Sequence, residues 1–152
     1  MRVGDEQSFV EFEFKARESD GSPRAGDLAC SVSVANDGFY GTVSSVWFSP
    51  EDREEFLKQL GQFERARIGF VSLSNLSSLS DYNPLIFEIF SVDRLGHLAV
   101  KVELAKISYL GEELIPSKVS MSFLLDGEQF NSVVAGFRKL FSEIDGATEQ
   151  PI

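Results

Sequence analysis

Apolar and polar residues alternate with a period of two along several segments of this chain. The clearest segments are residues 9–17, 28–34, 97–107 and 119–125. Successive side chains of a β-strand point to opposite faces of a sheet, so this alternation predicts strands with one buried and one solvated face. Residues 39–48 and 85–92 are rich in β-branched and aromatic residues, which favours two further strands.

Short turn sequences separate these predicted strands. Asn36-Asp37-Gly38 tolerates the left-handed backbone of a hairpin turn, and Asp93-Arg94-Leu95-Gly96 predicts a second hairpin. Residues 66–84 hold one more candidate strand, at 68–73, followed by a serine-rich stretch typical of a loop. Leucines at every third position are expected to anchor this loop on the core: Leu73, Leu76 and Leu79.

Two amphipathic helices interrupt the strands. The first is predicted to begin at Ser49-Pro50-Glu51-Asp52, which combines an N-cap, a proline at the first helical position and carboxylates near the positive end of the helix dipole. Its apolar face is formed by Phe56, Leu57, Leu60 and Phe63. The second helix is capped by Asp126, with Gln129 at the spacing of a capping box. Its wide apolar stripe consists of Phe130, Val133, Val134, Phe137, Leu140 and Phe141.

This order of elements predicts a single α+β domain over residues 1–152. Short turns make neighbouring strands antiparallel, so we expect a curved antiparallel sheet of about six to seven strands with the two helices packed against it. A half-barrel and a sandwich-like arrangement both fit the pattern. The ordered core is expected to cover about residues 8–142, with mobile termini.

The charge balance is acidic and restricts the partners. The chain has 14 Lys and Arg against 24 Asp and Glu, a net charge of −10. Such a surface repels nucleic-acid phosphates and anionic membranes, so we expect neither as a direct partner and a basic protein as the partner if the charge serves recognition. The alternative is that the charge only maintains solubility. A lone cysteine, no apolar run in the first six residues and no long apolar span favour a cytoplasmic location.

No residue pattern predicts catalysis, a cofactor or a metal. His97 is the only histidine and falls on the polar face of its strand, where a solvated side chain is expected. Cys30 falls on the buried face and is expected to pack as a small hydrophobe. One histidine and one cysteine cannot form the usual zinc sites. Asp126-Gly127-Glu128 is explained by the helix cap.

Charged residues on the polar sheet face form the one candidate binding surface. We expect Glu11 and Glu13 to share this face with Lys101 and Glu103 of another strand, and we predict that the four residues contact a partner. The alternative is cross-strand charge pairing or plain solvation.

Several motifs together resemble a bacterial protein family. They are Gly38-Phe39-Tyr40-Gly41, the helix start Trp47-Phe48-Ser49-Pro50-Glu51-Asp52, Phe87-Glu88-Ile89, Asp93-Arg94-Leu95-Gly96-His97, and Phe123-Leu124-Leu125-Asp126 followed by Gln129-Phe130. Over about residues 8–142 the chain resembles the WapI-type immunity proteins and related small domains of unknown function. The resemblance implies a non-enzymatic protein that neutralises a toxin domain, often a nuclease, and it carries over no catalytic residue.

Two other functions remain open from the residues alone. A Phe-lined space between sheet and helices would suit a small-ligand binding module. An enzyme that uses carboxylates alone ranks last, because nothing in the sequence places two of them across a cleft. A homo-oligomer is compatible with the interaction hypothesis.

Overall fold

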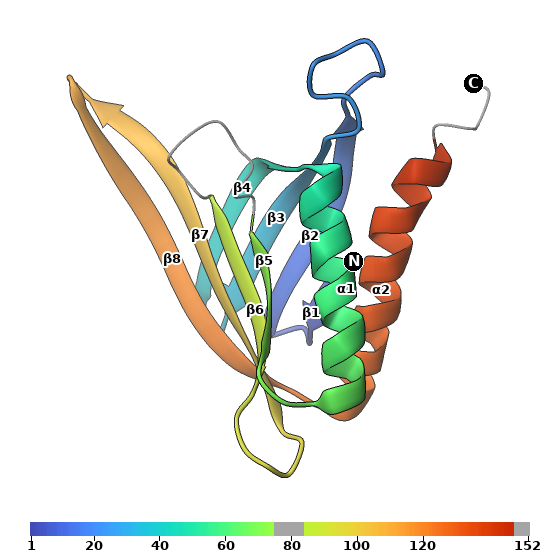
Figure 1. The fold of residues 1–152 in the computed structure, drawn as a ribbon. Helices are drawn as coiled ribbons and strands as arrows, with labels where there is room; N and C mark the ends of the chain where they lie inside the picture. Colours follow the sequence, from blue (N-terminus) through green and yellow to red (C-terminus); the bar gives the residue numbers. More distant parts are fainter. Residues whose placement is uncertain (75–83, 148–152) are drawn as a thin grey trace.

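The computed structural model describes residues 1–74 and 84–147, which form two four-stranded antiparallel sheets and two helices (Figure 1). Sheet A has the order β1 (Arg2–Gly4), β2 (Ser8–Arg17), β3 (Leu28–Asn36) and β4 (Phe39–Phe48). Sheet B has the order β5 (Phe70–Ser74), β6 (Leu85–Ser91), β7 (Leu98–Leu110) and β8 (Glu113–Leu125). The helices are α1 (Pro50–Ala66) and α2 (Gly127–Ala147).

The predicted α+β class with two helices is confirmed, but the single curved sheet of about six to seven strands is wrong in detail. The described residues form eight strands in two separate sheets. The chain leaves sheet A through α1 and begins sheet B with β5, so the helix divides the strands into two groups. Alternation shows which face of a strand is buried, whereas pairing depends on contacts between distant residues that the pattern does not contain.

The strand β1 was not predicted, and the segment before residue 8 was placed outside the ordered core. The structure pairs Val3 with Val10 of β2, and the Val3 side chain is fully buried. The α-amino group of Met1 donates a hydrogen bond to the Phe12 carbonyl at 2.8 Å. Gly4 has a φ of +114°, and a Cβ added there would lie 2.1 Å from the Ser8 carbonyl oxygen, so this turn requires glycine. A strand of three residues is too short to show a period.

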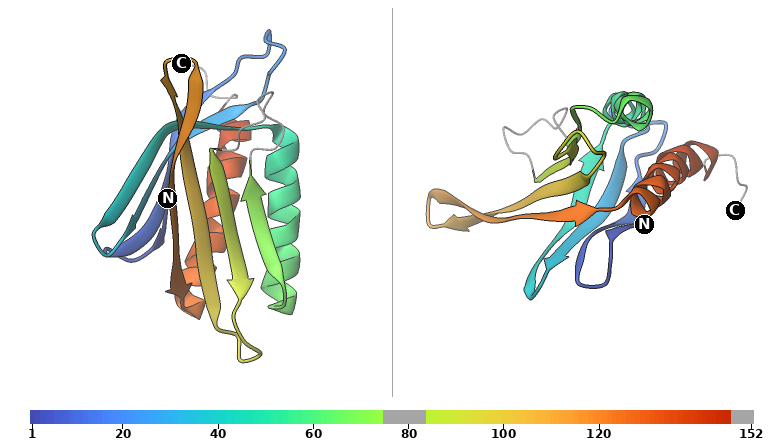
Figure 2. Two further views of the ribbon diagram at one scale, coloured as in Figure 1. Left: turned by 90° about the vertical axis from the view of Figure 1, so that its left-hand side faces the viewer. Right: turned by 90° about the horizontal axis from the view of Figure 1, so that it is seen from below.

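The inner faces of the two sheets pack on a common core, and the helices close its open side (Figure 2). Helix α1 lies along β5, and α2 lies beside β1. Phenylalanines fill the centre: the Phe12 ring of sheet A lies 5.5 Å from Phe87 of sheet B and 5.2 Å from Phe137 of α2. The sheets approach closely where β4 passes β8, because a Cβ added to Gly41 would lie 3.0 Å from a Val119 methyl group.

Both predicted helix starts are confirmed. The Ser49 hydroxyl accepts a hydrogen bond from the Asp52 amide at 3.1 Å, and the Asp52 carboxylate accepts one from the Ser49 amide at 3.4 Å. Asp126 and Gln129 form the corresponding box at the start of α2, with bonds of 2.7 and 2.9 Å. These reciprocal bonds satisfy amides that have no partner inside the helix.

Arg53 is a buried charge that the sequence did not reveal. It is only 3% exposed, and its guanidinium donates to the carbonyls of Gly26 at 2.7 Å and Phe141 at 3.4 Å. The side chain therefore ties α1 to the loop before β3 and to the last turns of α2. Its position in the polar first turn of an amphipathic helix resembles that of any solvated arginine, so the pattern gave no signal.

The hairpin of β7 and β8 extends beyond the rest of sheet B (Figure 1). Strand β6 pairs with β7 only as far as Leu104, whereas β7 and β8 continue to pair until Leu110 and Glu113. We call residues 105–117 the arm. The candidate strand at 68–73 is confirmed as β5, with Leu73 buried, while Leu76 and Leu79 lie outside the described residues. Within the described ranges, no helix is long and apolar enough to cross a membrane.

Candidate functional site

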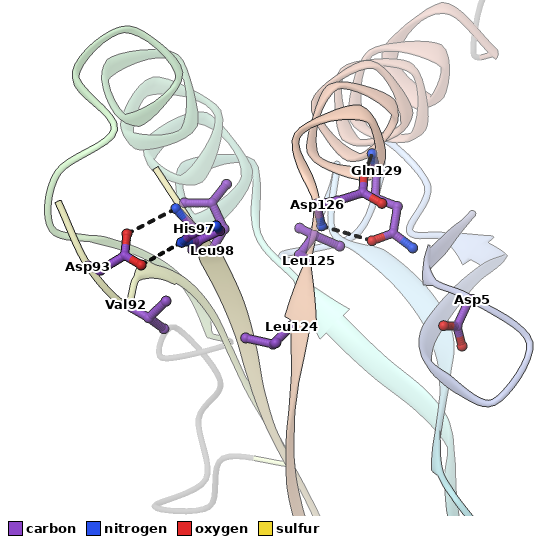
Figure 3. A pocket seen from close by; sticks show the side chains of 9 residues that line it. All are labelled: Asp5, Val92, Asp93, His97, Leu98, Leu124, Leu125, Asp126 and Gln129. Carbon is purple, nitrogen blue, oxygen red and sulfur yellow. Dashed lines mark hydrogen bonds and ion pairs between the residues drawn. The ribbon is translucent and has the colours of Figure 1, made fainter. Parts of the chain in front are cut away.

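A pocket of about 590 Å³ opens at one end of the molecule, where the β6–β7 turn, the β8–α2 junction and the β1–β2 turn meet (Figure 3). We call it the Leu124 pocket. Its lining consists of Asp5, Val92, Asp93, His97, Leu98, Leu124, Leu125, Asp126 and Gln129. It therefore combines apolar side chains with three carboxylates, one imidazole and one amide.

The carboxylates of this pocket are held by the local backbone. Oδ1 of Asp5 accepts hydrogen bonds from the amides of Gln7 and Ser8, both at 2.8 Å. Oδ1 of Asp126 accepts the Gln129 amide as the N-cap of α2. These bonds fix each side chain before any ligand arrives, which lowers the entropic cost of binding.

Asp93 is held by its own turn. Its Oδ1 accepts the Leu95 amide at 2.7 Å and the His97 amide at 3.3 Å, and its Oδ2 contacts Nδ1 of His97. The hydrogen bond from the His97 side chain, assisted by these two amides, lowers the pKa of the Asp93 carboxyl below its usual value. The amides of Ser8 and Gln7 likewise lower the pKa of Asp5. Both groups are therefore carboxylates at neutral pH.

Two apolar side chains of the pocket are unusually exposed. Leu124 is 74% exposed and Val92 is 45% exposed. Leu124 also ends a row of residues that the strand register aligns across the outer face of sheet B, namely Phe70, Phe90, Ala99 and Leu124. Phe70, at the opposite end of that row, is 65% exposed. Between these ends Phe90 is half-buried and Ala99 is buried, so the exposed apolar surface of this row lies at its two ends.

His97 is exposed, as predicted, but its pairing with Asp93 was not foreseen. An imidazole oriented by a carboxylate occurs in nucleophilic catalysis only beside a nucleophile. The described residues that line this pocket include no hydroxyl, thiol or amine side chain. In the part of the chain that the structure describes, no group of three or more His, Cys, Asp or Glu side chains is placed to hold a metal ion.

The four predicted contact residues do not form one surface. Glu11 and Glu13 lie on β2 in sheet A, whereas Lys101 and Glu103 lie on β7 in sheet B. Each pair projects from the outer face of its own sheet, on either side of the shared core. The expectation of a single polar face is therefore wrong. Alternation identifies the polar positions within each strand, but it does not show which strands join the same sheet.

Neighbouring charges also occupy most of these side chains. Arg2 contacts Glu11 at 2.9 Å, Lys15 contacts Glu13 at 3.5 Å, and Lys118 contacts Glu103 at 3.5 Å. Lys101 lies directly opposite Glu88 in the register of β6 and β7. The contacts of Arg2 with Glu11 and of Lys118 with Glu103 join neighbouring strands, as the alternative of cross-strand charge pairing expects, whereas Glu13 and Lys15 lie on the same strand.

Cys30 lies where the pattern predicted, on the inner face of β3, and is fully buried. Burial raises the pKa of its thiol to about 12. Because the thiolate is the nucleophilic form, we expect this buried thiol to be unreactive in the folded state.

The Leu124 pocket was not predicted, although the sequence holds a signal for it. Residues 119–125 alternate regularly except at Leu124, where a polar residue would continue the outer face. An apolar residue at a solvated position of a strand marks either a covered or a docking surface.

Comparisons with known proteins leave the family open. No protein-family model matches the chain, and neither a curated protein nor a solved structure matches it significantly. The resemblance to the WapI-type immunity proteins therefore stays a prediction.

Proposed function

We propose that the protein is a non-enzymatic interaction protein that binds a basic partner, and that this partner is a toxin domain, of nuclease type, which the chain neutralises. The observation that carries the proposal is the Leu124 pocket, where exposed apolar side chains lie among three preoriented carboxylates. The net charge of −10 supports it, because nucleases expose basic surface for phosphates. The toxin is what the family resemblance implies.

In this mechanism, electrostatic attraction brings the partners together and contact excludes the substrate. An acidic inhibitor approaches a basic surface faster than a neutral one, and the rate falls as salt screens the charges. The bound inhibitor then occupies the surface that nucleic acid needs, so inhibition requires no catalytic group.

The test is co-expression with candidate nuclease-type toxin domains from genes that neighbour this one. We expect growth to be restored and a complex of fixed stoichiometry to elute as one species in size-exclusion chromatography. If an expressed, active toxin kills the cells equally with and without this protein, the proposal is wrong.

The size of the pocket favours a second candidate, a small-ligand binding module. A volume of about 590 Å³ lies within the usual range of ligand sites. A metabolite that prefers the folded state would raise the melting temperature in a thermal-shift screen. If the protein shows such a shift and does not bind the toxin, the ligand function replaces the first proposal.

A further inference from the structure

We infer that the Leu124 pocket receives a basic segment of the partner that inserts an apolar side chain flanked by arginine or lysine. The inference deepens the proposed function by naming the surface that binds the partner and the residue types that this surface recognises. It rests on the proposed function in one respect, that the natural ligand is a protein.

The apolar part of the inserted segment is specified by Leu124 and Val92. Both side chains are exposed, although Leu124 lies within β8 and Val92 directly follows β6. Leu125 and Leu98 line the same pocket from the buried side. An aliphatic side chain that enters the pocket would remove this exposed surface from water, which favours binding.

The basic part is specified by Asp5 and Asp126. In each residue one oxygen is fixed by backbone amides, and no hydrogen bond within the described ranges uses the other oxygen, Oδ2. A guanidinium or ammonium group can approach this second oxygen without breaking the turn or the helix cap. Charge-assisted bonds to such fixed carboxylates are stronger than neutral ones.

Charge disfavours a second copy of this chain and a neutral apolar ligand as the occupant. A second copy of this chain would bring its own net charge of −10 against three carboxylates. A neutral apolar ligand would shield these carboxylates from water and give them no partner in return. A segment with both apolar and cationic groups satisfies every part of the pocket.

The experiment uses a defined peptide and the complete protein. The probe is acetylated and amidated Arg-Arg-Leu-Arg-Arg, titrated into ¹⁵N-labelled protein at low salt. We expect shifts confined to the amides around the pocket, foremost Val92, His97, Leu124 and Gln129. The peptide Arg-Arg-Ser-Arg-Arg should bind the wild-type protein at least fivefold more weakly than the leucine peptide does. The leucine peptide should also bind the Leu124→Ser variant at least fivefold more weakly than it binds the wild type.

Charge variants separate the pocket from the overall acidity. The double substitution Asp5→Asn and Asp126→Asn retains an oxygen for each backbone bond, so the fold is preserved, and it should weaken binding at least fivefold. Its matched control is Glu112→Gln with Glu113→Gln at the tip of the arm, which removes the same charge and should change binding less than twofold. Circular dichroism confirms that each variant is folded.

The outcomes distinguish this inference from the proposed function. Equal weakening by both double variants, shifts spread over the surface, or equal binding of the serine peptide would each overturn it. Neutralisation of the toxin by the Asp5 and Asp126 double variant at unchanged affinity would overturn it while the proposed function stands. If the protein binds the peptide specifically at the pocket but does not neutralise the toxin, the inference about the pocket is supported and the proposed function is wrong.

Discussion

Replacement of Phe137 by alanine tests whether the aromatic cluster holds the sheets and helices together. Phe137 is fully buried, and its ring lies 4.8 Å from Phe56, 5.2 Å from Phe12, and 5.6 Å from both Phe87 and Phe141. These neighbours come from α1, sheet A, sheet B and α2 itself. Truncation of this one ring therefore removes aromatic contacts to α1 and to both sheets at once.

The expected loss of stability follows from burial and ring contacts. Truncation of a buried phenylalanine to alanine costs about 3–5 kcal/mol, because the transfer free energy is lost and a cavity remains. Four ring neighbours place Phe137 in the upper part of this range, about 4–5 kcal/mol. For a domain of this size, that loss lowers the melting temperature by roughly 8–20 °C. The matched control is Phe39→Ala, since Phe39 is 75% exposed and its truncation should cost less than about 0.5 kcal/mol.

The assay is urea unfolding, followed by the fluorescence of Trp47, the only tryptophan, and by circular dichroism. Coincident transitions from the two probes establish two-state behaviour, which the comparison of free energies requires. Phe137→Leu should lie between the wild type and the alanine variant because it retains most of the volume. A free energy of unfolding for Phe137→Ala within about 1 kcal/mol of Phe39→Ala would refute the reasoning.

Three further predictions follow from single residues. Cys30 should resist a thiol reagent in the folded protein and react fully in denaturant, since burial both excludes the reagent and raises its pKa to about 12; fast labelling of native protein would contradict this. Gly127→Ala should raise the free energy of unfolding by about 0.5–1 kcal/mol, because an added Cβ meets nothing within 4 Å at the start of α2; urea unfolding measures the change, and destabilisation would be the wrong sign. In NMR, the Asp93 carboxyl should titrate below its ordinary pKa, and His97→Ala should move this pKa upward because the hydrogen bond from the imidazole is lost. The stability that Asp93 contributes is present above that ordinary value and is lost as the pH falls through the lowered one, so the variant should lose less stability in acid.

The sequence predicted the local features of the fold well. The caps at Ser49 and Asp126 and the turn at Gly38 depend on residues a few positions apart, and the structure confirms each of them. The burial of Cys30 followed from alternation alone.

Features that depend on distant residues could not be predicted in the same way. The division into two sheets separates Glu11 from Lys101, although both occupy polar positions of regular strands. The Leu124 pocket combines three turns that are distant in sequence, so its carboxylates gave no common signal before the chain was folded. Arg53 shows the same limit, because the carbonyls of Gly26 and Phe141 that it contacts lie 27 and 88 residues away.

The arm has a consequence for association between copies of this chain. The Ala105 amide donates to the Pro84 carbonyl, so the backbone polar groups of odd-numbered residues in β7 point away from β8. Pro116 lies opposite Ile107 and therefore directs its ring nitrogen toward the free edge of β8. That edge lacks a donor at Pro116 and carries a charge at Lys118, two features that oppose the addition of another strand. The arm thus extends into water as a two-stranded ribbon, and its β8 edge is protected against the strand pairing between molecules that leads to aggregates.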